Sequence, residues 1–160
     1  MRNGRRGCGS WLAHLRHEWQ RRVGEVAVVA RVLDGDSIRL ADGREVRYLG
    51  IDAPELYGPD GRPAPWAEAA KAANARLVEG RRVRLLAGKD EPDRDRYGRL
   101  LRHVYRGRLW VNGQLVAMGL ARVRRSGSSD PRAVRLQRLE AAARRRRRGL
   151  WRNEGPRHRG

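Results

Sequence analysis

Hydrophobic and polar residues alternate in the early part of the chain in a way that predicts three β-strands. Residues 26–33 form a nearly continuous run of β-branched and small apolar side chains, and residues 37–41 and 45–51 alternate between apolar and polar positions. The two connections between these runs each contain an Asp-Gly pair, which is typical of a tight hairpin turn. The pattern therefore predicts a three-stranded meander.

Two more strands are predicted further along the chain. Residues 81–87 place Val83, Leu85 and Ala87 on one face of a fourth strand. A polar, acid-rich loop then leads to a fifth strand at residues 100–106.

Three helices are predicted from apolar residues at helical spacing and from end signals. The first ends at Gly80, and its apolar stripe is Trp66, Ala70, Ala73 and Leu77. A short second helix covers residues 111–118 and ends at Gly119. The third has Asp130 as N-cap and Pro131 as its first residue, and its buried stripe is Ala133, Leu136, Leu139 and Ala143.

These elements predict an α+β fold that is mainly β: a five-stranded β-barrel of the OB type with three α-helices. The chain of 160 residues, 39% of them hydrophobic, is long enough for one core, so the domain is expected at residues 26–151. Residues 1–25 are expected to be a basic N-terminal extension, in which Ser10 is the expected N-cap of a short amphipathic helix. Residues 152–160 are expected to be a flexible basic tail.

The formal net charge of +19 indicates a polyanionic partner. More than half of the excess lies at the two ends of the chain, residues 1–25 and 144–160, where arginine runs suggest non-specific phosphate contacts. Nucleic acid is the first interpretation and an anionic membrane surface the second. No apolar run approaches the ~18 residues that a membrane span needs. The single Cys8 excludes an internal disulfide and a cysteine-based zinc site.

Acidic and guanidinium side chains at strand ends provide candidate chemistry for phosphodiester hydrolysis. Asp36 begins the second strand and Asp52 ends the third, so the two carboxylates could meet at one end of the barrel. With a backbone carbonyl and water they make an oxygen-only site that suits Ca²⁺ or Mg²⁺. Arg47 precedes Asp52 by five residues, which nominally places them on opposite faces of a strand, so a bend near Gly50 is required.

Three sequence blocks together resemble the staphylococcal nuclease (thermonuclease) family. They are Asp34-Gly35-Asp36, Arg47-x4-Asp52-Ala53-Pro54-Glu55 and Asp95-Arg96-Tyr97-Gly98-Arg99, and the similarity runs from about residue 26 to residue 151. The resemblance implies an OB-fold barrel with three helices and Ca²⁺-dependent hydrolysis of DNA and RNA. It implies Ca²⁺ in preference to Mg²⁺, and a monomer is expected.

The resemblance also implies a role for individual residues. Asp36, Asp52 and the backbone carbonyl of Ala53 match the family's metal ligands. Glu55 matches the carboxylate that orients or deprotonates the attacking water. Arg47 and Arg99 match the arginines that hold the scissile phosphate.

Other positions of the three blocks are expected to support the site. Asp34 and Asp95 occupy acidic positions of the family pattern, and Tyr97 is expected to anchor its loop. The segment 121–126 lacks the tyrosines that stack on the nucleotide in the type member of the family, so Arg124 and Arg125 are expected to bind nucleic acid instead. Weak base preference and strong salt dependence should follow.

Two other functions remain open on the sequence. A non-catalytic OB module could bind nucleic acid through its arginines, but it would be expected to have lost at least one of the five site residues, and all are present. A basic structural or ribosome-associated protein would explain the charge but not the carboxylates. Family members are often exported, yet no secretory signal is visible here, so the expectation is a cytoplasmic protein.

Overall fold

A computed structural model of the chain describes residues 24–124 and 129–153. The strands are β1 (Glu25–Val32), β2 (Ser37–Leu40), β3 (Glu45–Tyr48), β4 (Ile51–Asp52), β5 (Arg82–Leu86), β6 (Leu100–Arg106), β7 (Leu109–Trp110) and β8 (Arg122–Val123). The helices are α2 (Ala67–Val78), α3 (Val111–Ala117) and α4 (Pro131–Arg145), followed by a 3-10 turn, η1 (Gly149–Trp151). The predicted N-terminal helix and most of the predicted tail lie outside the described residues.

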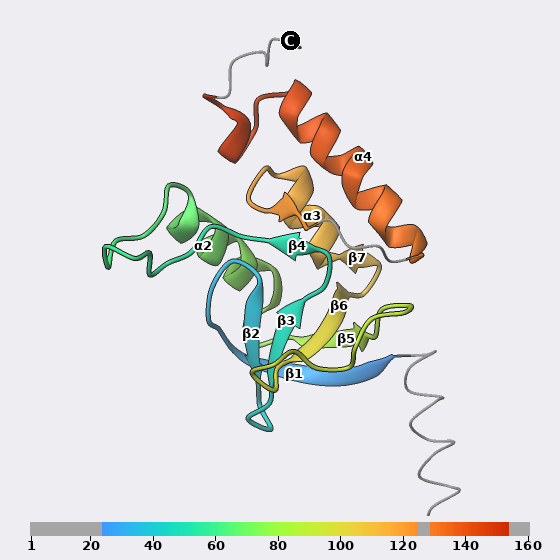
Figure 1. Cartoon of the computed structure of the whole chain (residues 1–160). Helices are drawn as coiled ribbons and strands as arrows, with labels where there is room; N and C mark the ends of the chain where they lie inside the picture. The colour runs from blue at the N-terminus through green and yellow to red at the C-terminus, as the bar shows by residue number, and fades with distance from the viewer. Residues whose placement is uncertain (1–23, 125–128, 154–160) are drawn as a thin grey trace, which may run out of the picture.

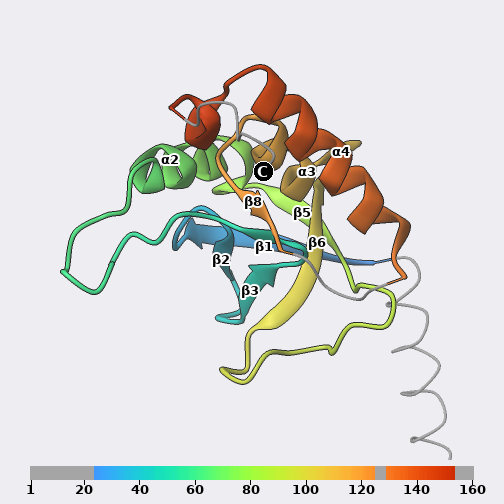
Figure 2. The same ribbon diagram turned by 45° about the horizontal axis from the view of Figure 1, so that its top comes forward.

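Five strands close into the predicted barrel. Neighbouring strands follow the order β3-β2-β1-β5-β6, and β3 also pairs with β6 in parallel, which closes the sheet. The other barrel pairings are antiparallel, and those of β1 with β2 and of β2 with β3 form the predicted meander. The three helices lie on the same side of the barrel (Figures 1 and 2). The predicted α+β fold of the OB type is therefore confirmed.

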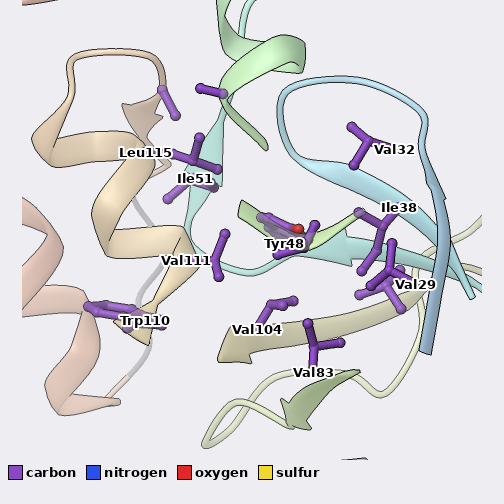
Figure 3. Packing of buried hydrophobic residues seen from close by; sticks show 14 of the residues in the cluster. Val29, Val32, Ile38, Tyr48, Ile51, Val83, Val104, Trp110, Val111 and Leu115 are labelled. Carbon is purple, nitrogen blue, oxygen red and sulfur yellow. The ribbon is translucent and has the colours of Figure 1, made fainter. Parts of the chain in front are cut away.

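The core lies inside the barrel and under the helices. Alternate positions of β1, β2 and β5, such as Val29, Ile38 and Val83, point inward and are buried, as the period-two pattern predicts. Figure 3 shows these residues packed with side chains from β3, β6 and α3. Among the described residues no helix is long and apolar enough to cross a membrane.

The third predicted strand is interrupted. Strand β3 ends at Tyr48, and the chain bends at Gly50, where φ is 74°, before it continues as the two-residue strand β4. Strand β4 leaves the barrel and pairs with β8 instead. The bend predicted between Arg47 and Asp52 is thus present. Because of it, Ile51, which was expected to end the third barrel strand, lies in β4 outside the barrel.

The predicted buried stripes of the first helix and the fourth strand need three corrections, at Trp66, Leu77 and Ala87, and of these Leu77 is only partly buried. Trp66 is 36% exposed and is the N-cap of α2, with φ at 72°, because the helix begins one residue later. The buried face of α2 consists of Ala67, Ala70, Ala73, Asn74 and Val78. Ala87 lies beyond the end of β5, and Leu86 is buried in its place.

The ends of α4 agree with the sequence prediction. The Asp130 side chain accepts a hydrogen bond from the Arg132 N–H at 2.9 Å, which is an N-cap contact, and Pro131 is the first helical residue. Leu136 and Ala143 are buried, whereas Ala133 and Leu139 are only partly buried. Trp151 in η1 packs back on the domain, where it is 1% exposed.

We predict that Gly50→Ala destabilises the domain more than Gly43→Ala does. Both glycines have positive φ, but a Cβ at Gly50 would lie 2.7 Å from Cδ1 of the buried Leu136, whereas nothing lies within 4 Å of a Cβ at Gly43. Alanine in the left-handed backbone conformation costs about 1–2 kcal/mol at either position. The steric overlap of its Cβ with Leu136 adds roughly 1–3 kcal/mol at position 50 alone. Urea denaturation measures the two free energies of unfolding, and equal losses would contradict the packing role of Gly50.

Candidate active site

The turn between β1 and β2 places Asp36 at the end of the barrel. The Asp36 N–H donates to the Asp34 carboxylate at 2.9 Å, so Asp34 shapes the turn. Gly35 lies so close to α2 and to the residue after β4 that a Cβ would be 2.5 Å from the Cβ of Ala53 and 2.8 Å from that of Ala70. Only glycine allows this approach, which brings Asp36 against the segment that carries Asp52.

The Arg47 side chain joins the two carboxylates that the sequence assigns to a metal. Its Nη1 lies 2.5 Å from Oδ2 of Asp36, and its Nη2 donates to Oδ1 of Asp52 at 2.6 Å. Nη1 also donates to the carbonyl of Ile51 at 3.1 Å. The structure therefore brings Asp36, Arg47 and Asp52 together, although Arg47 and Asp52 are five residues apart on strands.

Asp36 is the most buried carboxylate of this group. Its side chain is 6% exposed, and its oxygens accept hydrogen bonds from the Ala53 N–H at 2.6 Å and the Ser37 hydroxyl at 3.3 Å. Burial raises the pKa of Asp36 to about 7, and this effect exceeds the opposing one of the Arg47 guanidinium; the charge of Asp34 raises it further.

The remaining residues of the second block are open to solvent. The side chain of Asp52 is 64% exposed, and Ala53 is partly buried. Glu55 is exposed in the loop after β4, and its carboxylate makes no hydrogen bond or ion pair with another described residue. Its backbone carbonyl accepts the N–H of Ala64 at 2.9 Å, which closes that loop. Glu55 is thus held by the backbone, while its carboxylate faces water.

The donor set around Asp36 suits a hard cation. In the described part of the chain no group of three or more His, Cys, Asp or Glu side chains could hold a metal ion. The candidate ligands are instead two carboxylates, of Asp36 and Asp52, and the backbone carbonyl of Ala53. All three are oxygen donors, which Ca²⁺ and Mg²⁺ prefer, and the solvent-exposed side of Asp52 leaves room for water ligands.

The third block forms a turn that orients Arg99. Oδ1 of Asp95 accepts the N–H groups of Tyr97 and Arg99, each at 3.0 Å, and Oδ2 accepts Nε of Arg99 at 2.8 Å. Burial acts to raise the pKa of Asp95, but these hydrogen bonds outweigh it and the pKa is lowered. Asp95 therefore fixes both the backbone of the turn and the direction of the Arg99 side chain.

Tyr97 is not the loop anchor that the sequence suggested. Its ring is 69% exposed, and the guanidinium carbons of Arg96 and Arg99 lie 4.8 and 5.5 Å from its centroid. Asp95 anchors the turn instead.

An open cleft lies between this turn and the bend at Gly50. Its charged and aromatic lining residues are Arg47, Tyr48, Glu91, Arg94, Asp95, Arg96, Tyr97, Arg99 and Arg124. Arg124 is placed there by the bond from its N–H to the Gly50 carbonyl at 2.9 Å, and Arg125 lies outside the described residues. Arg47 lines the cleft and also holds the two carboxylates, so it joins the cleft to the candidate cation site.

Three residues support or extend the site but were not predicted from the sequence. Asn74 is fully buried in α2, where it accepts the Tyr48 hydroxyl at 2.9 Å and donates to the Asp34 carbonyl at 3.1 Å. A polar residue within an alanine-rich helix stripe was the signal for it. Arg94 and Arg96 line the cleft, and their alternation with aspartates in the acid-rich loop could have indicated a shared surface.

The comparisons with known proteins place these features in one family. The family model described as staphylococcal nuclease homologue matches residues 45–153. The thermonuclease of Staphylococcus intermedius is 32% identical over 131 residues, which cover 80% of this chain and 77% of that protein. An uncharacterized endonuclease of Escherichia coli O157:H7 is 37% identical over 132 residues, 80% of this chain and 78% of its own. Endonuclease YncB of Bacillus subtilis is 40% identical over 96 residues, which cover 58% of this chain and 45% of that protein.

We predict that Asp36 makes the cation-free protein less stable as the pH rises from about 4 to 7. In this window the folded protein keeps the Asp36 proton, because its pKa is raised to about 7, whereas the unfolded chain has lost it. Proton release then favours unfolding, by at most about 1.4 kcal/mol per pH unit. Asp36→Asn removes the contribution of this proton to the free energy of unfolding. The stability of the variant relative to the native chain should therefore increase with pH.

Urea denaturation in chelator at pH 4.5 and pH 8 measures this difference. Groups outside the site titrate in both proteins and cancel in the comparison. A difference that stays constant, or that changes in the opposite direction, would show that the pKa of Asp36 is not raised.

Proposed function

Because the chain belongs to the staphylococcal nuclease family, we propose that it hydrolyses phosphodiester bonds of DNA and RNA with the aid of Ca²⁺ and with little sequence preference. Mg²⁺ is the less favoured cation. The observation that carries the proposal is the position of Arg47, which binds both candidate ligand carboxylates and also lines the arginine-rich cleft. A phosphate in the cleft would therefore lie next to the carboxylate pair.

Asp36, Asp52 and the carbonyl of Ala53 would hold the cation. When bound there, Ca²⁺ acts as a Lewis acid that stabilises negative charge on the phosphate oxygens. The buried Asp36 is preorganised by its hydrogen bonds, and the exposed Asp52 faces the solvent from which substrate arrives. The ligands thus come from two chain segments that the turn at Gly35 brings together.

The two arginines bind the reacting phosphate. Arg47 and Arg99 each present a planar guanidinium that can donate paired hydrogen bonds to phosphate oxygens. Arg99 is held by Asp95, so less conformational entropy is lost when it binds. As negative charge builds up on the phosphate oxygens in the transition state, these fixed donors stabilise it more than they stabilise the bound substrate.

Glu55 is the proposed general base. Its exposed carboxylate can accept a proton from a water molecule whose oxygen forms the new bond to phosphorus while a P–O bond of the backbone breaks. The short hydrogen-bonded loop that begins at Glu55 fixes its backbone near Asp52.

The cleft also supports weak base preference. Among the described lining residues, arginines outnumber the single exposed aromatic residue, Tyr97. Arg124 and Arg125 are proposed to bind the nucleic-acid backbone, which is the same for every base. We propose that the protein acts as a monomer.

We predict that the purified chain degrades single-stranded DNA and RNA with added Ca²⁺, and that excess chelator abolishes the cleavage. Glu55→Gln should lower the rate by about 10²–10⁴, the usual effect of losing a general base, while binding of the substrate persists. Glu91→Gln is the matched control, because it removes the same charge from a residue that lines the cleft. A gel-based cleavage assay and a fluorescence anisotropy titration measure the two properties.

Each outcome of this assay bears on a different part of the proposal. Undiminished cleavage in chelator would contradict the role of the cation. Equal cleavage rates for Glu55→Gln and Glu91→Gln would contradict the role of Glu55 as general base and leave the rest of the proposal intact. Binding without cleavage, both with added Ca²⁺ and when the assay is repeated with Mg²⁺, would instead favour the alternative function, a non-catalytic OB module that binds nucleic acid.

A further inference from the structure

The solvent-facing side of α4 carries arginines that the cleavage site does not use. Arg135, Arg138 and Arg145 are exposed, and we call them the α4 ridge. The only acidic residue within the helix, Glu140, is turned away from solvent: it accepts the Val123 N–H at 2.9 Å and pairs with Arg144 at 3.3 Å. The exposed face of α4 therefore carries positive charge alone.

Local helix stability does not explain this charge. The helix dipole favours cations in the last turn, where Arg145 lies, but not in the first half of the helix, where Arg135 lies. Arg135 and Arg138 are three residues apart, so they repel each other on the helix surface. Arg138 makes no ion pair with another described residue. The guanidinium of Arg135 lies 5.4 Å from the ring centroid of Trp110, which fixes its position without neutralising it.

The length and composition of the ridge fit a nucleic-acid backbone. Ten residues separate Arg135 from Arg145, which is about 15 Å along the helix axis and matches about four base pairs of a duplex. Between them the exposed Ala141 is small enough to let a backbone approach the helix closely. No aromatic residue lies on the exposed positions of α4, so the ridge has no platform for stacking single-stranded bases. These features favour the phosphates of duplex DNA.

An anionic membrane is a poorer fit. A helix that binds at a membrane surface inserts its apolar face into the lipid. The apolar face of α4, with Leu136 and Ala143, is buried in the domain, and the isolated Val134 is its only large apolar side chain that is mainly exposed.

The ridge is also separate from the cleft. None of its three arginines lines the cleft. Figures 1 and 2 show α4 along the outer edge of the molecule, packed on α3.

We propose that the α4 ridge is a second nucleic-acid contact, which binds the phosphate backbone of duplex DNA outside the cleavage cleft. This binding requires no hydrolysis, so it does not rest on the proposed activity. It would hold a long substrate to the protein whether or not a scissile phosphate lies in the cleft.

The test compares two triple variants of the full chain. Arg135→Gln, Arg138→Gln and Arg145→Gln together remove the ridge charges. Arg31→Gln, Arg76→Gln and Arg82→Gln together remove three exposed charges from β1, α2 and β5, and this second variant is the matched control. Fluorescence anisotropy with a 20-base-pair duplex, in chelator and at 50 to 200 mM NaCl, gives the affinity and its salt dependence. Thermal denaturation followed by circular dichroism checks that both variants fold.

The ridge variant should lose about tenfold or more in affinity at 100 mM NaCl. Its slope of log K against log salt should decrease in magnitude by about 2 to 3, since each lost phosphate contact contributes about 0.9. The control variant should change much less. Cleavage of a trinucleotide, a substrate that needs only the cleft, should be the same in both variants.

Three results would overturn the proposal. Equal weakening by the two variants would show that only net charge matters, and unchanged binding by the ridge variant would show that the ridge does not contact the duplex. Loss of binding to anionic lipid vesicles with duplex binding retained would assign the surface to a membrane. Failure of every variant to cleave the trinucleotide would contradict the proposed hydrolysis alone, because duplex binding is measured without it.

Discussion

The guanidinium of Arg47 holds together the chain segments on which the site is built. It contacts Asp36 at the start of β2, Asp52 in β4 and the carbonyl of Ile51, and this requires the bend at Gly50. The Asp36 carboxylate is buried, and Arg47 and the Ala53 N–H offset only part of its desolvation, so the site depends on these partners staying in place. The close approach at Gly35 and the hydrogen bonds of Asn74 in turn hold the Asp36 turn against α2. The geometry of the site therefore depends on a few exact backbone positions and one ion-pair network.

Much of the fold could be predicted from the sequence because its signals are local. Alternation and the Asp-Gly pairs indicate the hairpins, and the N-cap Asp130 with Pro131 marks the start of α4. The candidate site residues could be named from three blocks, and the requirement for a bend followed from the odd spacing of Arg47 and Asp52. These inferences need only neighbouring residues or a motif.

The rest depends on contacts between distant segments, which local patterns do not contain. The pairing of β4 with β8 follows from the bend at Gly50, so the alternation of residues 45–51 could not show where the strand ends. The role of Asn74 depends on a turn forty residues away. Tyr97 was misread because an aromatic residue in a loop packs inward in some folds, whereas here two arginines contact its exposed ring and Asp95 fixes the turn.

We propose that Asp36 and Asp52, from separate segments, form a single cation site. Calorimetric titration of Ca²⁺ into the native chain, Asp36→Asn, Asp52→Asn and the double variant tests it without any substrate. We expect one cation per native chain, a loss of about tenfold or more in affinity for each single variant, and at least as large a loss for the double variant, because each substitution removes one ligand of the same ion. Ca²⁺ affinity that is unchanged when either Asp36 or Asp52 is replaced, or a second Ca²⁺ ion bound per native chain, would contradict a shared site.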